Sequence, residues 1–249
     1  MQIEDMISVI IPAYNCTTTI RQAIDSALAQ DVLLEVIVVD DASKDDLDEV
    51  MREYEQDDRV IYLKNDKNMG PSATRNRGIS EARGAYVAFL DADDYWIAGK
   101  LSRQYKLLQD TGMILCSTGR ELITHDGQAT GRIIPVKERI TYEDMLHQNW
   151  INNSSVLVKQ EVLLDFPMEE DDVHEDYLLW LKVLRKYGTG CAINEPLLMY
   201  RMSKNSKSGS KLKSACMTYK TYRRLGMSNL QAMKSFLSYA LAGLKKYYS

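Results

Sequence analysis

The sequence predicts an α/β fold in which a mostly parallel central sheet has helices on both faces. Short apolar segments rich in β-branched residues alternate with segments of helical periodicity over the first ~110 residues. Two of the apolar segments end in acidic clusters, so polar side chains gather along one edge of the sheet. No segment approaches the run of about 18 apolar residues that a membrane-spanning helix requires.

The composition is that of a globular protein. The chain has 249 residues, 45% hydrophobic and 27% charged, which fits one large domain or a domain with an appendage. Glu4 and Asp5 stand where a signal peptide would be basic, so we expect a cytoplasmic protein. The four cysteines form no CxxC pair and are expected to be reduced thiols: Cys16, Cys116, Cys191 and Cys216.

Charge is distributed unevenly along the chain. The whole sequence has 31 basic and 35 acidic residues, but from Arg201 to Ser249 there are eleven Lys or Arg and no Asp or Glu. Such a change of sign suggests a polyanionic partner for the basic end, either nucleic acid or anionic lipid. No RNA-binding aromatic motif or helix-turn-helix pattern supports nucleic acid. We therefore expect no nucleic-acid partner and a peripheral contact with an anionic membrane.

The first elements follow from local patterns. Ile7–Ile11 is a β-branched run stopped by Pro12, and Thr17–Gln30 has apolar residues at helical spacing. Pro71 suits the first turn of a helix, and Gly84 follows its end. The remaining segments of this half are predicted as strands at Glu35–Val39, Val60–Leu63 and Tyr86–Leu90 and as helices at Leu47–Tyr54 and Pro71–Arg83.

The second half is less regular. Residues 118–140 are expected to form a loop or a small antiparallel excursion around Asp126 and Gly127. Ser203–Ser214 is rich in Ser, Lys and Gly and is expected to be mobile. We divide the chain into a domain of residues 1–205 and a basic helical extension of residues 206–249. The other predicted elements are helices at Lys100–Gln109, Gln160–Leu164 and Glu175–Tyr187 and strands at Met113–Ser117, Val156–Val158 and Leu197–Tyr200.

The segment Asn229–Tyr248 predicts an amphipathic helix with basic flanks. Its apolar stripe contains Leu230, Met233, Leu237, Leu241, Leu244 and Tyr248. Lys234 and Lys245 flank that stripe, and a basic amphipathic helix can lie in a membrane interface. Packing on its own domain or on a second copy in a homodimer stays open as the alternative.

Three carboxylates end the apolar segment Tyr86–Leu90: Asp91, Asp93 and Asp94. Acids this close repel one another unless a cation lies between them. Mg²⁺ and Mn²⁺ take oxygen ligands and often complete their shell with substrate phosphates. The sequence therefore predicts a divalent-cation site here, and the alternative is a solvated acidic loop.

Several short segments occur in a characteristic order: Val9–Asn15, Val38–Ser43, Asn68–Gly78, Phe89–Asp94, Glu175–Leu181 and Tyr200–Arg201. This ordered set resembles glycosyltransferase family 2, the inverting transferases of GT-A fold, over roughly residues 6–205. The resemblance implies a nucleotide-sugar donor, most often a UDP-sugar, and a divalent cation, Mn²⁺ or Mg²⁺. It also implies a saccharide or lipid-linked saccharide as acceptor.

The resemblance assigns donor-binding residues near the first two strands. The segment that contacts the nucleotide is matched by Pro12, Ala13, Tyr14 and Asn15. Tyr14 would stack near the base. Asp40 and Asp41 match the acidic pair after the second strand, and Asp41 is favoured as acceptor for the uracil N–H. The alternative for this pair is a helix N-cap.

Further matches concern the diphosphate. Arg75 matches an arginine near the nucleotide, its alternative being a solvated helix face, and Gly70 permits close backbone approach. Asp91 and Asp93 match the DxD pair on either side of Ala92, which joins the donor site. Asp93 is expected to bind the metal directly, and Asp91 to contact the ribose or the metal and its water. Asp94 is expected to support the loop.

Asp176 matches the catalytic base, which takes the proton from the attacking acceptor hydroxyl. At a helix start, its charge also gains from the helix dipole. The alternative is that Glu175 and Asp176 only cap that helix. Trp180 is expected in the core, and His174 near the site.

The sequence departs from the family pattern after Arg201. The family often has a His two residues after this Tyr-Arg pair, where this chain has Ser203. Arg201, Lys204 or Lys207 would neutralise the diphosphate instead. His125 and His147 are expected to be ordinary surface residues.

The predicted function is an inverting, metal-dependent sugar transfer to a glycan or lipid-linked acceptor in bacterial surface polysaccharide biosynthesis, at the inner face of the cell membrane. Two alternatives remain. A phosphohydrolase would use Asp91 as nucleophile, but it would prefer Thr or Val where Tyr95 stands. The other alternative is a non-catalytic binding protein with a basic tail.

Overall fold

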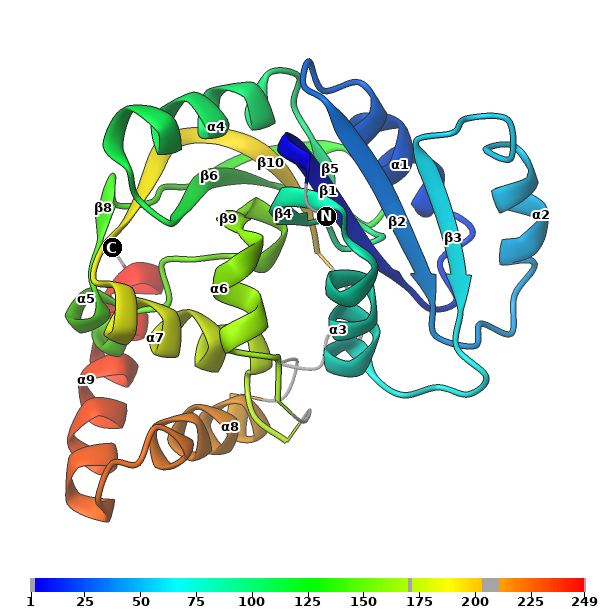
Figure 1. Ribbon diagram of the computed structural model, residues 1–249. Coiled ribbons are helices and arrows are strands. Elements are labelled where there is room, and N and C mark those ends of the chain that lie inside the picture. Colours follow the sequence, from blue (N-terminus) through cyan, green and yellow to red (C-terminus); the bar gives the residue numbers. More distant parts are fainter. Residues whose placement is uncertain (1–2, 170–171, 203–210, 249) are drawn as a thin grey trace.

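The computed structural model describes residues 3–169, 172–202 and 211–248 (Figure 1). Its strands are β1 (Ile3–Ala13), β2 (Leu34–Asp40), β3 (Val60–Lys64), β4 (Gly84–Phe89), β5 (Tyr95–Trp96), β6 (Leu115–Ile123), β7 (Ala129–Ile134), β8 (Arg139–Ile140), β9 (Leu157–Lys159) and β10 (Gly190–Arg201). Its α-helices are α1 (Ile20–Leu28), α2 (Leu47–Arg52), α3 (Pro71–Glu81), α4 (Lys100–Thr111), α5 (Tyr142–His147), α6 (Gln160–Asp165), α7 (Glu175–Tyr187), α8 (Lys211–Arg224) and α9 (Asn229–Tyr248). Among the described residues, no helix has the length and hydropathy needed to span a membrane.

One twisted sheet holds these strands together, in the order β3-β2-β1-β4-β9-β6-β10-β5, with β7 on β6 and β8 on β10. The first four strands of that order pair in parallel, as the alternation of strands and helices predicts. β9 is antiparallel to both of its neighbours, β4 and β6, while β6 and β10 are parallel. The sheet is therefore mixed, and its four-stranded parallel part comes from the N-terminal strands.

Helices cover both faces of the sheet, as predicted. Because successive side chains of a strand point to opposite faces, Ile10 and Phe89 join one core with α3, α6 and α7. Val9 and Ala88, one position away, join a second core with α1, α2 and α4. In Figure 1, α3, α6 and α7 lie on one side of the sheet and α4 on the other.

The elements differ from the prediction where backbone hydrogen bonds outside the predicted segment set their ends. α1 begins at Ile20 rather than Thr17, because a turn precedes it in which Thr19 N–H donates to the Cys16 carbonyl. The excursion around Asp126 and Gly127 is the β6–β7 hairpin, as predicted. β10 extends far beyond the predicted Leu197–Tyr200, because it pairs along its length with β6. Residues 203–210 of the predicted mobile segment lie outside the described residues.

The C-terminal helices α8 and α9 form a hairpin that shares a core with the rest of the protein. Tyr222, Leu225 and Ala232 belong to the same buried cluster as α7. Figure 1 shows the hairpin on the side of the molecule opposite β3 and α2. The boundary between residues 205 and 206 falls in the undescribed segment and stays a prediction.

Candidate active site

A cleft of about 700 Å³ opens at the carboxyl ends of β1, β2 and β4. Ligands of open α/β sheets bind at this edge, because the strand-to-helix loops meet there. The cleft is lined by most of the predicted site residues: Pro12, Ala13, Tyr14, Asn15, Asp41, Arg75, Asp91, Ala92, Asp93 and Arg201. Several other lining residues were not predicted: Cys16, Thr18, Thr19, Asn68, Thr74, His125 and Met202. His125, expected to be an ordinary surface residue, is exposed but lies at the cleft.

The β1–α1 loop is tied to the β2–α2 loop. Asn15 adopts a left-handed φ of 50°, which Asn tolerates better than most residues. Its backbone N–H donates to Ser43 Oγ at 3.0 Å, and its Oδ1 accepts from Lys44 N–H at 2.8 Å. This holds Tyr14, which is 44% exposed, at the wall of the cleft.

The two adjacent aspartates after β2 face different surroundings. Asp40 is 1% exposed and does not line the cleft. Its Oδ1 accepts from Ser43 N–H at 2.8 Å and its Oδ2 from the Tyr62 hydroxyl at 3.1 Å. The geometry of Asp40 thus fits a role in holding the loop rather than the predicted donor contact.

Asp41 lines the cleft and binds the loop ahead of α3. Its Oδ1 and Oδ2 accept from the backbone N–H groups of Met69 and Gly70, both at 2.8 Å. Gly70 has a φ of 85°, in the left-handed region that glycine enters without steric cost. Asp41 thereby fixes the start of α3, the helix that carries Arg75.

The three aspartates after β4 point in different directions. Asp91 and Asp93 line the cleft, whereas Asp94 is 2% exposed and accepts from Arg201 N–H at 2.9 Å. Burial, and then the charge of Asp91, raise the pKa of the Asp93 carboxyl to about 6. A cation beside Asp93 would relieve both effects.

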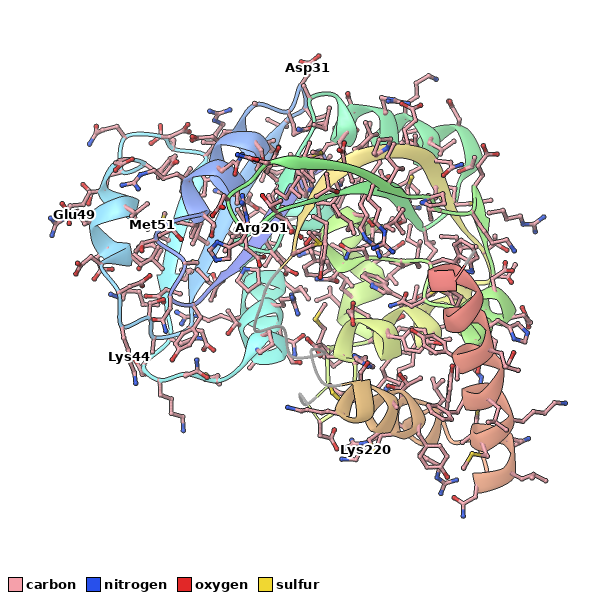
Figure 2. The ribbon with its side chains drawn as sticks, turned by 180° about the vertical axis from the view of Figure 1, so that it is seen from behind. Asp31, Lys44, Glu49, Met51, Arg201 and Lys220 are labelled. Carbon is pink, nitrogen blue, oxygen red and sulfur yellow. The ribbon has the colours of Figure 1, made fainter. Side chains whose placement is uncertain are left out.

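Arg201 joins three parts of the chain. Its Nε donates to the Asp93 carbonyl at 2.7 Å, its Nη1 to the His125 carbonyl at 2.8 Å and its Nη2 to Gln22 Oε1 at 2.7 Å. Figure 2 shows Arg201 near the middle of the molecule, where β10 ends. Most of its donors are therefore used inside the protein. Lys204 and Lys207 lie outside the described residues.

Arg75 links the cleft to the helix of the predicted base. Its side chain is 8% exposed and lies between two carboxylates, with Nη2 at 2.7 Å from Asp91 Oδ1 and Nη1 at 3.3 Å from Glu175 Oε1. Its Nε is buried and has no hydrogen-bond partner in the described structure. The link from Arg75 to Glu175 was not predicted. The sequence pointed to Glu175 only as the residue before the predicted base, Asp176.

Asp176 does not line the cleft; it lies beside Glu175 in the first turn of α7. Its Oδ1 accepts from Tyr177 N–H at 2.7 Å. Burial, and then the charge of Glu175, raise the pKa of Asp176 to about 6, against the opposing effect of Arg75. Trp180, one turn later, is fully buried in the core, as predicted.

The residues that could hold a divalent cation are Asp91 and Asp93. Among the described residues, no three His, Cys, Asp or Glu side chains gather closely enough to enclose a metal ion. Mg²⁺ commonly binds through one or two carboxylates, with waters and substrate phosphates as further ligands. An aspartate pair at the cleft, with one half-buried carboxyl of raised pKa, fits that arrangement.

Comparisons with known proteins show which proteins this chain resembles. The family model "Glycosyl transferase family 2" matches residues 8–161. The chain is 34% identical to the "Putative teichuronic acid biosynthesis glycosyltransferase TuaG" of Bacillus subtilis, over 97% of each chain. It is 32% identical to the "UDP-Glc:alpha-D-GlcNAc-diphosphoundecaprenol beta-1,3-glucosyltransferase WfaP" of Escherichia coli, over 98% of this chain and 96% of that protein.

Two solved structures share the fold. TarS of S. aureus, crystallised with UDP-GlcNAc, superposes with a TM-score of 0.76 at 17% identity, over 98% of this chain and 73% of that one. The mannosyltransferase PcManGT of Pyrobaculum calidifontis, in complex with GDP-Man and Mn²⁺, gives a TM-score of 0.67 at 18% identity, over 98% and 75%. The fold expected from the ordered motifs is thus confirmed.

Proposed function

This chain belongs to glycosyltransferase family 2, and from that premise we propose that it transfers a sugar from a UDP-sugar to a hydroxyl of a lipid-linked saccharide, with inversion. Family membership makes it a glycosyltransferase and leaves the phosphohydrolase and the non-catalytic binding protein without support. One observation carries the proposal. The Arg75 guanidinium joins Asp91 of the cleft to Glu175, the neighbour of Asp176.

The donor nucleotide would bind at the ends of β1 and β2. The exposed ring of Tyr14 offers a face for the base. Asp41 already accepts two backbone N–H groups and the Asn65 side-chain amide, but an ionised carboxylate has about four acceptor positions and can take the uracil N–H as well. Arg75 lines the cleft and adds positive charge beside Asp91, where the diphosphate would bind. UDP is supported by the named donor of WfaP and by the ligand of TarS.

Asp93, with Asp91, would hold Mn²⁺ or Mg²⁺ against the donor diphosphate. When bound, such a cation stabilises negative charge on the departing nucleoside diphosphate. The protein's own part is to place these carboxylates: Arg201 holds the Asp93 carbonyl, and Arg75 orients Asp91.

Asp176 would act as the base. It takes the proton of the acceptor hydroxyl while that oxygen attacks the anomeric carbon, and the nucleoside diphosphate leaves from the opposite face of the sugar. A raised pKa of about 6 suits this step, because the carboxylate is ionised near neutral pH and is still a stronger base than an ordinary Asp. The hydrogen bond from Tyr177 N–H fixes its direction.

The acceptor proposal rests on relatives. WfaP is named for an acceptor on diphosphoundecaprenol and TuaG for teichuronic acid biosynthesis. By the same relation, we propose that this protein serves in the assembly of a bacterial surface polysaccharide. Peripheral contact with the cytoplasmic face of an anionic membrane stays a prediction from the sequence. A homodimer stays a prediction.

Thermal unfolding with UDP-sugars and Mn²⁺ tests the proposal. A donor that binds the native state should increase the free energy of unfolding by about 2.7 kcal/mol at a ligand concentration of 100 Kd, and so raise Tm. Asp93→Asn should reduce this shift. Asp176→Asn should keep the shift and lose transfer of radiolabelled sugar to a saccharide acceptor, by at least about 100-fold.

The paired variants separate donor binding from chemistry. Leu164→Glu, an exposed substitution on α6, serves as the control with wild-type behaviour in both assays. No Tm shift with any nucleotide-sugar, or full transfer by Asp176→Asn, would contradict the proposal.

A further inference from the structure

Helix α9 has two apolar faces, and within the part of the chain that the structure describes only one of them packs against the rest of the protein. Ala232, Phe236 and Tyr239 lie on the inner face, in or against the core that also contains α7. The ring of Tyr239 lies 5.7 Å from that of Tyr177. The inner face explains why α9 is attached to the domain, but it accounts for none of the stripe predicted from the sequence.

The predicted stripe is exposed. The exposed fractions are 82% for Leu230, 46% for Met233, 54% for Leu237 and 63% for Leu241. Their spacing of three and four residues places them in one row along the helix. Single exposed apolar residues are normal on a protein, but a continuous row of four is typical of an interaction surface. The side chains of Leu244, Lys245 and Tyr248 lie outside the described part.

The charges around this row favour an anionic partner. Every charged residue from Arg201 to Ser249 is basic. Lys234 on α9 and Lys213 and Arg223 on α8 are exposed. Figure 2 shows Lys220 on the outside of α8, where Asp172 lies 3.7 Å from it and compensates part of its charge.

A second copy of the chain fits this surface less well. A two-fold symmetric contact places the same patch on both sides of the interface. Lys234 beside this row would then enter the interface from both copies, and neither α8 nor α9 contains an acidic residue to neutralise it. An anionic bilayer offers both an apolar interior for the four side chains and negative headgroups for the lysines.

The hairpin also touches the helix of the proposed base. Ser214, near the start of α8, has its Oγ and its carbonyl oxygen 3.2 Å from His174 Nε2, and His174 directly precedes Glu175. A membrane bound by α9 would therefore lie against the hairpin that contacts the start of α7.

We propose that the row formed by Leu230, Met233, Leu237 and Leu241 docks the protein into an anionic lipid bilayer. This proposal rests on the proposed function only for its biological context, because binding to a lipid bilayer requires neither donor nor acceptor. The apolar side chains enter the headgroup boundary, and the exposed Lys234 beside them contacts anionic headgroups.

Co-sedimentation with vesicles tests this proposal on the full chain. Phosphatidylcholine vesicles containing phosphatidylglycerol should bind the wild type, and pure phosphatidylcholine should bind it much less. Leu237→Glu and Leu241→Glu should each weaken binding about tenfold or more, because a leucine loses its burial in the bilayer. Lys234→Glu should weaken binding mainly at low salt, where charges are least screened.

Matched controls separate docking from folding and from function. Leu33→Glu and Leu164→Glu change leucines that are 58% and 61% exposed away from α9, and should bind as the wild type does. All variants should keep the wild-type Tm and its shift with UDP-sugar, so a failure of vesicle binding is distinct from a failure of the proposed activity.

Three results would overturn the proposal: no binding of the wild type to anionic vesicles, equal losses in the control variants, or a dimer in light scattering that Leu237→Glu converts to monomers. The last result would assign the row to a second copy of the chain.

Discussion

Arg75 is the residue on which the two halves of the site meet. It lies nearly buried between Asp91, at the end of β4, and Glu175, at the start of α7. Burial disfavours its charge, but the charges of Asp91 and Glu175 outweigh this and raise the pKa of the guanidinium. The arginine therefore stays ionised and keeps the carboxylates of two distant segments at a fixed distance.

The same contacts predict a pH dependence for the transfer reaction. A base must be ionised, so kcat/KM should fall as the pH drops below about 6, the pKa of Asp176. Because the charge of Glu175 raises that pKa, Glu175→Gln should move the acidic limb of the profile to lower pH. Glu161→Gln, in the first turn of α6, is the control and should leave the limb in place. If the acidic limb of the profile stays in place in Glu175→Gln, that limb does not report the ionisation of Asp176.

Among the elements, α3 depends on an unusually close approach to β1. A Cβ at Gly78 would lie 2.6 Å from Ile10 Cγ2, closer than real side chains come. Ile10 is fully buried in the sheet and has no room to withdraw. The absent side chain therefore sets how near α3, and with it Arg75, lies to the strands.

The direction in which Gly78→Ala changes the free energy of unfolding tests this contact. In an exposed helix, this substitution would stabilise by about 1 kcal/mol. Here it should destabilise by about 1–3 kcal/mol, through overpacking against Ile10. Tm should fall about 2–4 °C for each kcal/mol. In a double-mutant cycle with Ile10→Ala, the combined loss should be smaller than the sum of the single losses. A Tm equal to or above that of the wild type would rule out the clash.

For the molecule as a whole, the C-terminal hairpin is part of the fold and not a detachable tail. Tyr222 is fully buried, its hydroxyl donates to the Leu146 carbonyl, and its ring lies 6.2 Å from that of Tyr177. Leu225 and Ala232 extend the same core. The hairpin thus covers the outer side of α5 and α7, the helix that begins with Glu175 and Asp176.

Deleting residues 211–249 should therefore destabilise the whole protein. The loss of three buried side chains from one core should cost about 5 kcal/mol or more. Circular dichroism on heating should show a Tm lower by at least 10 °C, or no folded protein. Leu230→Ser with Leu241→Ser, which removes only exposed side chains, should keep nearly the wild-type Tm. A deletion with wild-type Tm would mean that the hairpin is independent of the domain.

The parts of the site that sequence could predict are those that follow a strand directly. Tyr14, Asp41, Asp91 and Asp93 each stand within a few residues of a strand end, so the parallel sheet brings them to one edge. Gln22 gave no such signal, because its contact with Arg201 joins residues 179 positions apart. A pattern of neighbours along the chain contains no information about such a pair.

The amino-acid sequence by itself determined the alternation of strands and helices, the acidic ends of two strands and the apolar stripe of α9. All of these arise from periodicity and local chemistry, which act over a few residues. Only the tertiary structure decided that Asp41 faces the cleft while Asp40 turns inward, that Arg75 reaches Glu175, and which side of α9 stays exposed. Burial and direction depend on the segments that fold against a residue, and these come from distant parts of the chain.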